Sequence, residues 1–285
     1  MTQKRKILII AFLIFCNLVA FSIFLDLRRD QNFEIVFFDV GQGDAALIRT
    51  PDRKNVLIDG GPGEKILPHL ANELPFWDRD IDLMILSHAH ADHLSGLVEV
   101  LERFSVEKVL WNKQSHDSLL YRQWEMLLED VDSRRAYKGQ RIDLSGAYLD
   151  VLYPPKDIDF AEDLNENSVI NRFVHDAGAI LFTGDAYKKQ ERKLLKWEEE
   201  CVDQNFDWCE VMNLPSQVLK AGHHGSSTSS DYEFVERVSP EVSIISAGKD
   251  NQYGHPHEEV VETFNDLGVD MHKTFKDGNF RVEVE

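Results

Sequence analysis

Three histidines and one aspartate occur within six residues of this sequence, as His88, His90, Asp92 and His93. The apolar segment 82–86 before them is typical of a buried strand, and residues 94–104 after them carry apolar side chains at helical spacing. Histidines at positions i and i+2 of a loop lie on the same side, so both can reach one metal ion while the next two side chains turn toward a second. Imidazole nitrogens and carboxylate oxygens are ligands that zinc takes in hydrolytic sites. The cluster therefore predicts a metal centre where a strand meets a helix.

Strands and helices alternate along the rest of the chain, with turn residues between them. The predicted strands are residues 33–38, 45–49, 55–58, 82–86, 108–111, 148–153, 169–174, 179–182, 218–221, 242–246, 271–275 and 280–284. The predicted helices are residues 64–74, 94–104, 119–128, 186–200 and 257–267. This alternation, with several hairpins, predicts an α/β protein in which helices cover mixed sheets. A chain of 285 residues is long enough for one large domain or for two small ones.

Residues 7–25 form an almost entirely apolar segment. As a helix it would be roughly 28 Å long, which is enough for the hydrocarbon core of a bilayer. Basic residues at positions 4–6 favour a cytoplasmic N-terminus. We therefore expect a membrane anchor over residues 1–30, with one transmembrane helix at about 7–25 and an extracytoplasmic domain at 31–285. A cleaved signal peptide ending near Val19-Ala20 and a buried core helix are the alternatives.

Charge and cysteines bear on the substrate and the compartment. The net charge of −19 repels polyanions at long range, so binding of nucleic acid would need a local site that overcomes this field; the same charge is also compatible with a merely well-solvated surface. Of the three cysteines, Cys16 lies in the apolar segment. Cys201 and Cys209 are close enough in sequence to form a disulfide if the domain faces an oxidising compartment, and otherwise would be two free thiols.

Four segments of the sequence resemble the metallo-β-lactamase superfamily, in the order that the family has them. They are the H-x-H-x-D-H cluster, Leu57–Gly61, Leu181–Ala186 and Leu219–Ser226. More narrowly, residues 39–45 (DVGQGDA), 165–169 (NENSV) and 253–257 (YGHPH) resemble the hydrolase domain of the ComEC competence proteins. The resemblance covers about residues 33–285 and implies the metallo-β-lactamase fold, an αββα sandwich.

The same resemblance implies a set of metal ligands. One metal would take His88, His90 and Asp185, and the other would take Asp92, His93, Asp185 and one histidine of the pair His223 and His224, with His223 preferred. Asp59 is implied as an aspartate that orients a ligand. The third histidine of the first site is missing, and Asn165–Ser168 stands in its place, while His175 is interpreted as a strand residue. The first site should therefore be looser, and it should accept manganese as well as zinc.

Several further residues are expected around the metals. Two glycines would turn the backbone sharply and bring Gln42 and Asp44 close to the centre, unless they form a plain hairpin. His255 is a candidate proton donor to the leaving group or a phosphate contact, and otherwise the residue that enters the next helix. The hydroxyl run 226–230 could contact a phosphate or cap a helix. Two lysines could hold a phosphate or lie at the surface. The expected outer or substrate-contacting residues are Asp39, Gln42, Asp44, Asp59, Asn165, Ser168 and Ser226, and the two lysines are Lys220 and Lys249.

The chemistry that these residues predict is hydrolysis assisted by two divalent cations. A water that bridges two cations loses a proton near neutral pH and attacks an electrophile, so no nucleophilic side chain is required. Asp92, Asp185 and His255 are the expected catalytic residues. The favoured reaction is phosphodiester hydrolysis, with single-stranded DNA as the first candidate by resemblance. Hydrolysis of a cell-wall or lipid phosphodiester, which the acidity favours, and a non-catalytic metal-binding module are the alternatives. ComEC proteins carry this domain beside a multi-helix channel, so we expect a separate protein to supply any channel.

Overall fold

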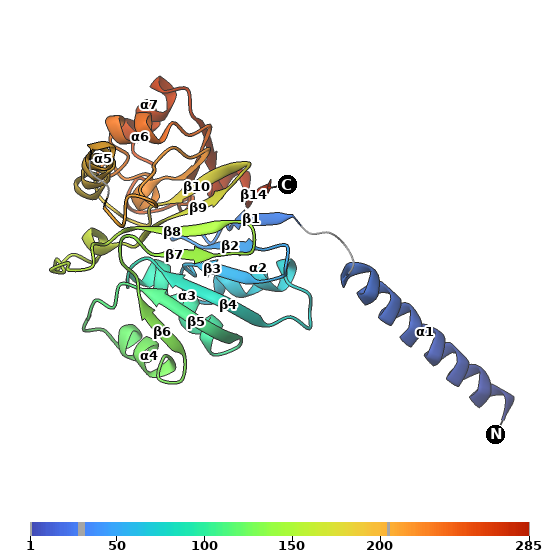
Figure 1. Ribbon diagram of the computed structural model, residues 1–285. Coiled ribbons are helices and arrows are strands. Elements are labelled where there is room, and N and C mark those ends of the chain that lie inside the picture. Colours follow the sequence, from blue (N-terminus) through green and yellow to red (C-terminus); the bar gives the residue numbers. More distant parts are fainter. Residues whose placement is uncertain (1, 28–31, 204–205, 285) are drawn as a thin grey trace. The chain divides into compact units, whose positions relative to one another are not determined.

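Two seven-stranded sheets form the body of the protein in the computed structural model, which describes residues 2–27, 32–203 and 206–284 (Figure 1). The first sheet has the order β14 (Phe280–Val284), β1 (Phe33–Phe37), β2 (Ala46–Arg49), β3 (Asn55–Ile58), β4 (Asp80–Leu86), β5 (Ser105–Trp111) and β6 (Asp132–Arg135). The second has the order β13 (Asp270–Lys273), β12 (Val242–Ile245), β11 (Val218–Lys220), β10 (Gly178–Phe182), β9 (Ile170–His175), β8 (Tyr148–Tyr153) and β7 (Arg141–Asp143). Strands far apart in the sequence thus become neighbours.

Helices cover the outer face of each sheet, which confirms the predicted α/β class. α2 (Ile66–Glu73), α3 (Ala91–Leu101) and α4 (Leu119–Leu127) share a buried apolar cluster with the first sheet. α5 (Lys188–Asp203), α6 (Tyr232–Val238) and α7 (Glu258–Asp266) share another with the second sheet, and α8 (Thr274–Asp277) is a short helix before the last strand. The layers are therefore helix, sheet, sheet and helix, as in the expected αββα sandwich (Figure 1).

A third apolar cluster lies between the sheets, and β1 shows how the sequence builds it. Phe33, Ile35 and Phe37 belong to the cluster between the sheets, whereas Val36 belongs to the cluster under the helices of the first sheet. Successive side chains of a strand point to opposite faces, so an uninterrupted apolar strand fits only where both faces are covered. The rings of Phe37 and Phe182, whose centroids are 5.3 Å apart, stack across the two sheets.

Two strands were not predicted, and both are polar edge strands. β6 reads Asp-Ser-Arg-Arg and β7 reads Arg-Ile-Asp, so neither has an apolar alternation that would reveal it. Each lies at one edge of its sheet, where pairing with β5 or β8 creates the strand. Among the predicted elements, the helix expected at 94–104 begins earlier, at Ala91. Asp92 and His93 are therefore in its first turn and not in the preceding loop.

The N-terminal helix α1 (Gln3–Leu27) forms a unit of its own, because the chain divides into residues 1–32 and 33–285. Its described large apolar side chains, from Ile7 to Phe21, are 39–68% exposed. Over the part of the chain that the structure describes, no helix has the length and apolarity needed to cross a membrane. The transmembrane span expected at residues 7–25 is thus not supported, and the side chains of residues 22–25 lie outside the described part.

Candidate metal centre

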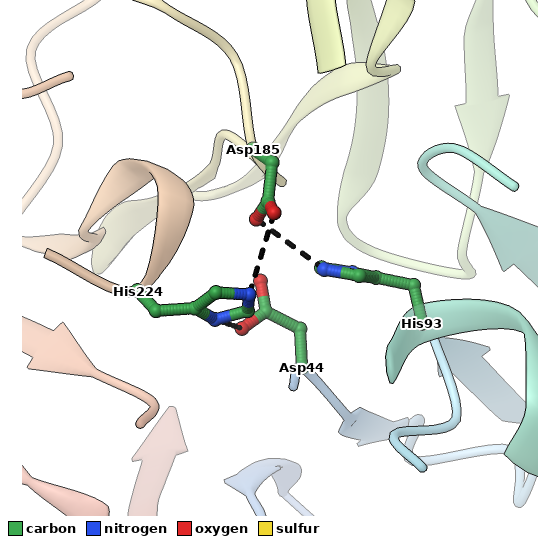
Figure 2. A group of neighbouring side chains, drawn as sticks. All are labelled: Asp44, His93, Asp185 and His224. Atoms are coloured by element: carbon green, nitrogen blue, oxygen red, sulfur yellow. Dashed lines mark ion pairs between the residues drawn. The ribbon is translucent and has the colours of Figure 1, made fainter. Parts of the chain in front are cut away.

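The carboxyl ends of parallel strands from both sheets meet at the histidine cluster. In the first sheet, β3 and β4 run parallel and end directly before Asp59 and Ser87. In the second sheet, β10 and β11 run parallel and lead into Asp185 and the pair His223–His224. Polar side chains that follow these strands therefore converge on one place, and Figure 2 shows three of them, His93, Asp185 and His224.

Asp44, His93, Asp185 and His224 form one group of potential ligands (Figure 2). His93 Nε2 lies 3.3 Å from Asp185 Oδ1, and His224 Nε2 lies 3.3 Å from Asp185 Oδ2. His224 Nε2 is also 3.3 Å from Asp92 Oδ2. Ligand atoms bound at about 2.0–2.2 Å to one tetrahedral ion lie roughly 3.3–3.6 Å apart. The spacing thus fits a shared divalent cation.

A second group consists of His88, His90 and the same Asp185. His88 Nε2 lies 3.1 Å from His90 Nδ1 and 3.7 Å from Asp185 Oδ2. Asp185 therefore faces both groups, as the sequence led us to expect for a carboxylate shared by two metals.

Several buried polar atoms at this centre have no hydrogen-bond partner among the described residues. These atoms are His93 Nε2, His224 Nε2, Asp185 Oδ1 and Asn165 Oδ1. A buried polar atom without a partner costs roughly 1–3 kcal/mol, so a cluster of them needs a ligand. Imidazole and carboxylate atoms pointing at one space suit divalent cations such as zinc or manganese, and the residues fit the metal centre that the sequence predicts.

Asp59 orients the histidine His93 from behind. Its Oδ2 lies 2.9 Å from His93 Nδ1, and it accepts hydrogen bonds from the backbone N–H and the hydroxyl of Ser87 at 2.8 and 2.6 Å. Because a carboxylate only accepts, His93 Nδ1 carries the proton and Nε2 is turned toward the centre. Ser87, to which the sequence assigned no role, also lies 3.0 Å from His88 Nδ1. In the sequence, only the position of Ser87 directly before His88 indicated that it could lie at the centre.

Gly60 and Gly96 allow α3 to approach the end of β3. A Cβ atom on Gly96 would lie 1.9 Å from the carbonyl oxygen of Gly60, and one on Gly60 would lie 2.3 Å from the backbone nitrogen of Leu97. Gly60 N–H donates to the carbonyl of His93 at 2.9 Å. This close contact fixes the first turn of α3, which carries Asp92 and His93.

Asp44 and Lys220 form a buried ion pair beneath His224, with Nζ and Oδ2 2.7 Å apart. Asp44 Oδ1 lies 3.2 Å from His224 Nδ1, which also donates to the carbonyl of Ser246 at 2.9 Å. Asp44 thus contacts the nitrogen of His224 that faces away from Asp185, and it orients the ring. Lys220 is only 3% exposed, so it neither lies at the surface nor is available to a phosphate, contrary to both sequence-based interpretations.

The backbone separates the adjacent residues His223 and His224. Both have left-handed dihedrals, with φ of 48° and 56°, and their side chains diverge. The His224 side chain is 2% exposed and contacts Asp92 and Asp185, whereas that of His223 is 22% exposed. The structure therefore places His224, and not the preferred His223, in the group with His93.

His223 instead belongs to a hydrogen-bonded chain at the rim. Its Nδ1 lies 3.0 Å from Thr228 Oγ1, and its Nε2 lies 3.4 Å from Asn165 Nδ2 and 3.8 Å from Asp185 Oδ2. Asn165 also donates to the hydroxyl of Tyr187 at 3.0 Å. Asn165 is thus linked through His223 to the neighbourhood of Asp185, the carboxylate that both groups share. The sequence gave no indication of Tyr187 beyond its position after the Asp185 motif.

Burial and neighbouring charges shift the pKa values of the histidines at the centre in opposite directions. Burial disfavours the charged form of His93, but the carboxylates of Asp185 and Asp59 raise its pKa well above the usual range. The pKa of His224 is likewise raised against burial by Asp185 and Asp44. Burial lowers the pKa of Asp185's neighbour His88, with the charge of His93 adding to this effect. A divalent cation bound by these histidines would replace the protons that Asp185 favours on them.

His255 lies at the edge of this group, with its ring centroid 5.6 Å from His223 and 6.3 Å from His224. Burial and the charges of His224 and His223 lower its pKa to about 4. Both roles expected from the sequence, proton donor to the leaving group and phosphate contact, stay predictions for His255; the neutral form can serve the second through an N–H.

The remaining expected residues make hydrogen bonds within and between loops and belong to neither group of potential ligands. Asp39 Oδ1 accepts from Gly41 N–H within a turn, and Gln42 Oε1 accepts from Gly248 N–H, which joins two loops. Ser168 Oγ accepts from Asp185 N–H at 3.3 Å. Ser226 Oγ accepts from the Thr228 hydroxyl at 3.0 Å, within the chain that includes His223.

The other polar candidates have structural places. Ser229 donates to the carbonyl of Ala186, and the residue before α6 is Asp231, whose side chain makes no capping bond, so the expected serine cap is absent there. Lys249 is exposed. His175 ends β9 and accepts from Ala177 N–H, as a strand residue does.

Comparison with known proteins agrees with this geometry. Residues 38–249 match the family model described as the metallo-beta-lactamase superfamily. The chain is 26% identical to ComE operon protein 3 of Bacillus subtilis, over 95% of this chain and 35% of that protein. It is 30% identical to Competence protein ComA of Neisseria gonorrhoeae, over 84% of this chain and 30% of that protein. The chain thus spans about a third of the length of the curated relatives it matches.

Solved structures share the fold at low identity. CmlA, a diiron β-hydroxylase from Streptomyces venezuelae, has a TM-score of 0.59 at 14% identity, covering 90% of this chain and 55% of that chain. The metallo-beta-lactamase fold protein YhfI from Bacillus subtilis has a TM-score of 0.56 at 12% identity, covering 89% and 100%. At such identities the likeness concerns the fold and not the reaction.

Proposed function

Because the chain belongs to the metallo-beta-lactamase superfamily, we propose that it is a metal-dependent hydrolase of phosphodiesters, with nucleic acid as the first candidate substrate. The observation that carries the proposal is the convergence of two groups of imidazole and carboxylate atoms on the shared side chain of Asp185. The choice of nucleic acid rests on the resemblance to ComEC competence proteins, with which the similarity to Competence protein ComA and ComE operon protein 3 agrees.

Two divalent cations at this centre would supply an activated water and would hold the oxygens of a phosphodiester. His88, His90 and Asp185 would bind one of them. Asp92, His93, His224 and Asp185 would bind the other. Zinc and manganese are both compatible with this ligand set. Asp59 and Asp44 would keep the two inner histidines oriented, since each contacts the ring nitrogen that faces away from the centre.

His255 and the rim around His223 would act on the substrate. A neutral His255 can donate one N–H to a phosphate oxygen, and a hydrogen bond to a charged group is worth roughly 1.5–3 kcal/mol. Asn165 and Thr228 hold His223 at the same rim. These residues would position the phosphate, while the carboxylates hold the cations.

A smaller extracytoplasmic ester, such as a cell-wall or lipid phosphodiester, is the second candidate. The net charge of −19 favours it, because an acidic protein repels a long polyanion. A separate channel protein, which the resemblance to ComEC proteins implied, stays a prediction.

We further propose that α1 holds the hydrolase domain at a membrane with the domain outside the cytoplasm. The exposed apolar side chains between Ile7 and Phe21 support this, since contiguous exposed apolar surface requires an apolar environment. The structure joins Cys201 and Cys209 in a disulfide, which supports an oxidising compartment.

Hydrolysis by the purified full chain tests the reaction. With Mn²⁺ or Zn²⁺ added, we expect cleavage of single-stranded DNA and of a small aryl phosphodiester. Asp185→Asn and Asp92→Asn should each lower turnover by more than about 100-fold, roughly 3 kcal/mol in the barrier. Asp130→Asn, at an exposed position far along the chain from the ligands, is the matched control and should leave turnover unchanged. Turnover that persists in excess chelator would contradict the proposal, and bound metal without any turnover would favour a binding module.

A further inference from the structure

An exposed tyrosine extends the metal centre outward. The ring of Tyr253 is 56% exposed and stacks on His255, with centroids 5.5 Å apart and an angle of 24° between the planes. His255 in turn contacts the rings of His223 and His224. The ring of His255 thus covers one face of Tyr253. Tyr253 is therefore connected to His223 and His224 through His255.

The loop that carries Tyr253 is held firmly from both sides. Asn251 donates to the carbonyls of Gly248 and His255, each at 2.8 Å, and accepts from the backbone N–H groups of Tyr253 and His255. On the other side, His257 accepts from Ser227 N–H at 2.9 Å, and its Nε2 lies 3.0 Å from the carbonyl of Tyr253. The same loop is joined to Gln42 through Gly248 N–H. The exposure of Tyr253 therefore belongs to a fixed position at the edge of the centre.

A flat, exposed ring at the edge of a phosphodiesterase centre suits a planar group of the substrate. In a nucleic acid, the base lies one sugar away from the phosphate, whereas lipid and glycerol phosphodiesters carry no planar aromatic ring there. Stacking of a base on an aromatic side chain tolerates any base, because every base has a π-face. It also requires no positive charge, which suits a strongly acidic protein.

We infer that the ring of Tyr253 is a stacking platform for the base next to the scissile phosphate, and that it makes the centre prefer nucleotide substrates over phosphodiesters without a ring. This inference rests on the proposed phosphodiester hydrolysis. It concerns the choice between the two substrate classes named above, a choice that the metal ligands do not make.

Paired substrates test the platform in the full chain. We compare kcat/KM for a short single-stranded oligonucleotide and for the same oligonucleotide lacking the base beside the scissile phosphate. The wild type should prefer the intact substrate by at least about fivefold, the lower range for one base stacked on one aromatic ring. Tyr253→Leu should remove this preference by slowing only the intact substrate, and Tyr253→Phe should keep it. Tyr148→Leu is the control, because Tyr148 is also exposed but pairs with Val174, at the opposite end of the strands from the centre.

A binding measurement separates the failure of this inference from failure of the proposed function. Fluorescence quenching of a 2-aminopurine oligonucleotide reports stacking without turnover, and it can be followed in Asp185→Asn. If quenching depends on Tyr253 but the wild type hydrolyses neither substrate, the proposed phosphodiester hydrolysis would be refuted, whereas base stacking on Tyr253 would be supported. Equal slowing of both substrates in Tyr253→Leu, or a wild type without preference, would overturn the platform.

Discussion

Adjacent residues can have different roles when the backbone turns between them, as it does at His223 and His224. His224 is buried beside two carboxylates, whereas His223 is partly exposed and its Nε2 lies 3.8 Å from the nearer oxygen of Asp185. Removing His224 should therefore affect metal binding far more than removing His223.

The prediction is that His224→Ala loses about one of two bound ions, whereas His223→Ala keeps both. Loss of a ligand should weaken affinity by more than the roughly 10–100-fold that loss of an outer partner costs. Elemental analysis after dialysis, together with titration calorimetry, measures both quantities. The reverse order of effects would restore His223 as the ligand.

His255 provides a second prediction at the residue scale. A phosphate contact should matter equally for any leaving group, so His255→Ala should slow an aryl phosphodiester and DNA alike, by about tenfold or more. His255→Phe keeps a ring for Tyr253 to stack on but lacks the N–H, and it should show the same loss with the aryl substrate. Rates that recover selectively with the aryl leaving group would instead identify His255 as the proton donor.

At the scale of elements, Glu191 of α5 connects that helix to the segment after the histidine pair. Its carboxylate is buried and accepts from the backbone N–H groups of Ser230 and Asp231 at 2.7 and 2.9 Å. Burial raises its pKa to about 7, against the effect of these hydrogen bonds.

This pKa predicts how stability depends on pH. Between about pH 4.5 and 7, the unfolded chain ionises Glu191 while the folded protein keeps the proton. The folded state then binds more protons, so the contribution of Glu191 to the free energy of unfolding should fall as pH rises through this window. Urea unfolding of wild type and Glu191→Gln at several pH values isolates the effect.

Glu191→Gln should flatten the dependence and should cost about 1–3 kcal/mol, because its amide NH₂ faces a backbone N–H. Glu199→Gln, at an exposed position of the same helix, should change neither quantity. Parallel pH curves for wild type and Glu191→Gln would show that Glu191 is ionised throughout.

At the scale of the whole molecule, the three apolar clusters among the described residues all consist of residues between 33 and 284. The chain from residue 33 onward should therefore fold without α1.

Deleting residues 1–32 should leave the melting temperature of the hydrolase domain unchanged within a few degrees, because no packed core is lost. It should also release the protein from the membrane fraction that survives an alkaline wash. A deletion that extends through Phe37 removes β1, which pairs with both β2 and β14, and should unfold the domain. A full-length chain found only in the soluble fraction would contradict the proposed membrane association.

Features that depend on neighbouring residues could be predicted from the sequence. The spacing of His88, His90, Asp92 and His93 at the end of an apolar strand predicts a metal site, because the local geometry of a strand and of the loop after it depends mainly on their own residues. Short apolar segments likewise located β3 and β8 at their observed bounds. The family motifs added Asp185 and Asp59, and the superfamily match confirms that resemblance.

Features that depend on distant contacts needed the tertiary structure. The choice of His224 over His223 follows from two left-handed residues whose direction is set by the surrounding sheets, and the burial of Lys220 follows from Asp44, which is 176 positions away in the sequence. β6 and β7 exist only because a neighbouring strand pairs with them. The stacking of Tyr253 on His255 likewise requires a loop that is hydrogen-bonded to Gly248 and Ser227. Sequence patterns report the conformation of a segment, whereas the partner of a side chain is decided by which segments folding brings together.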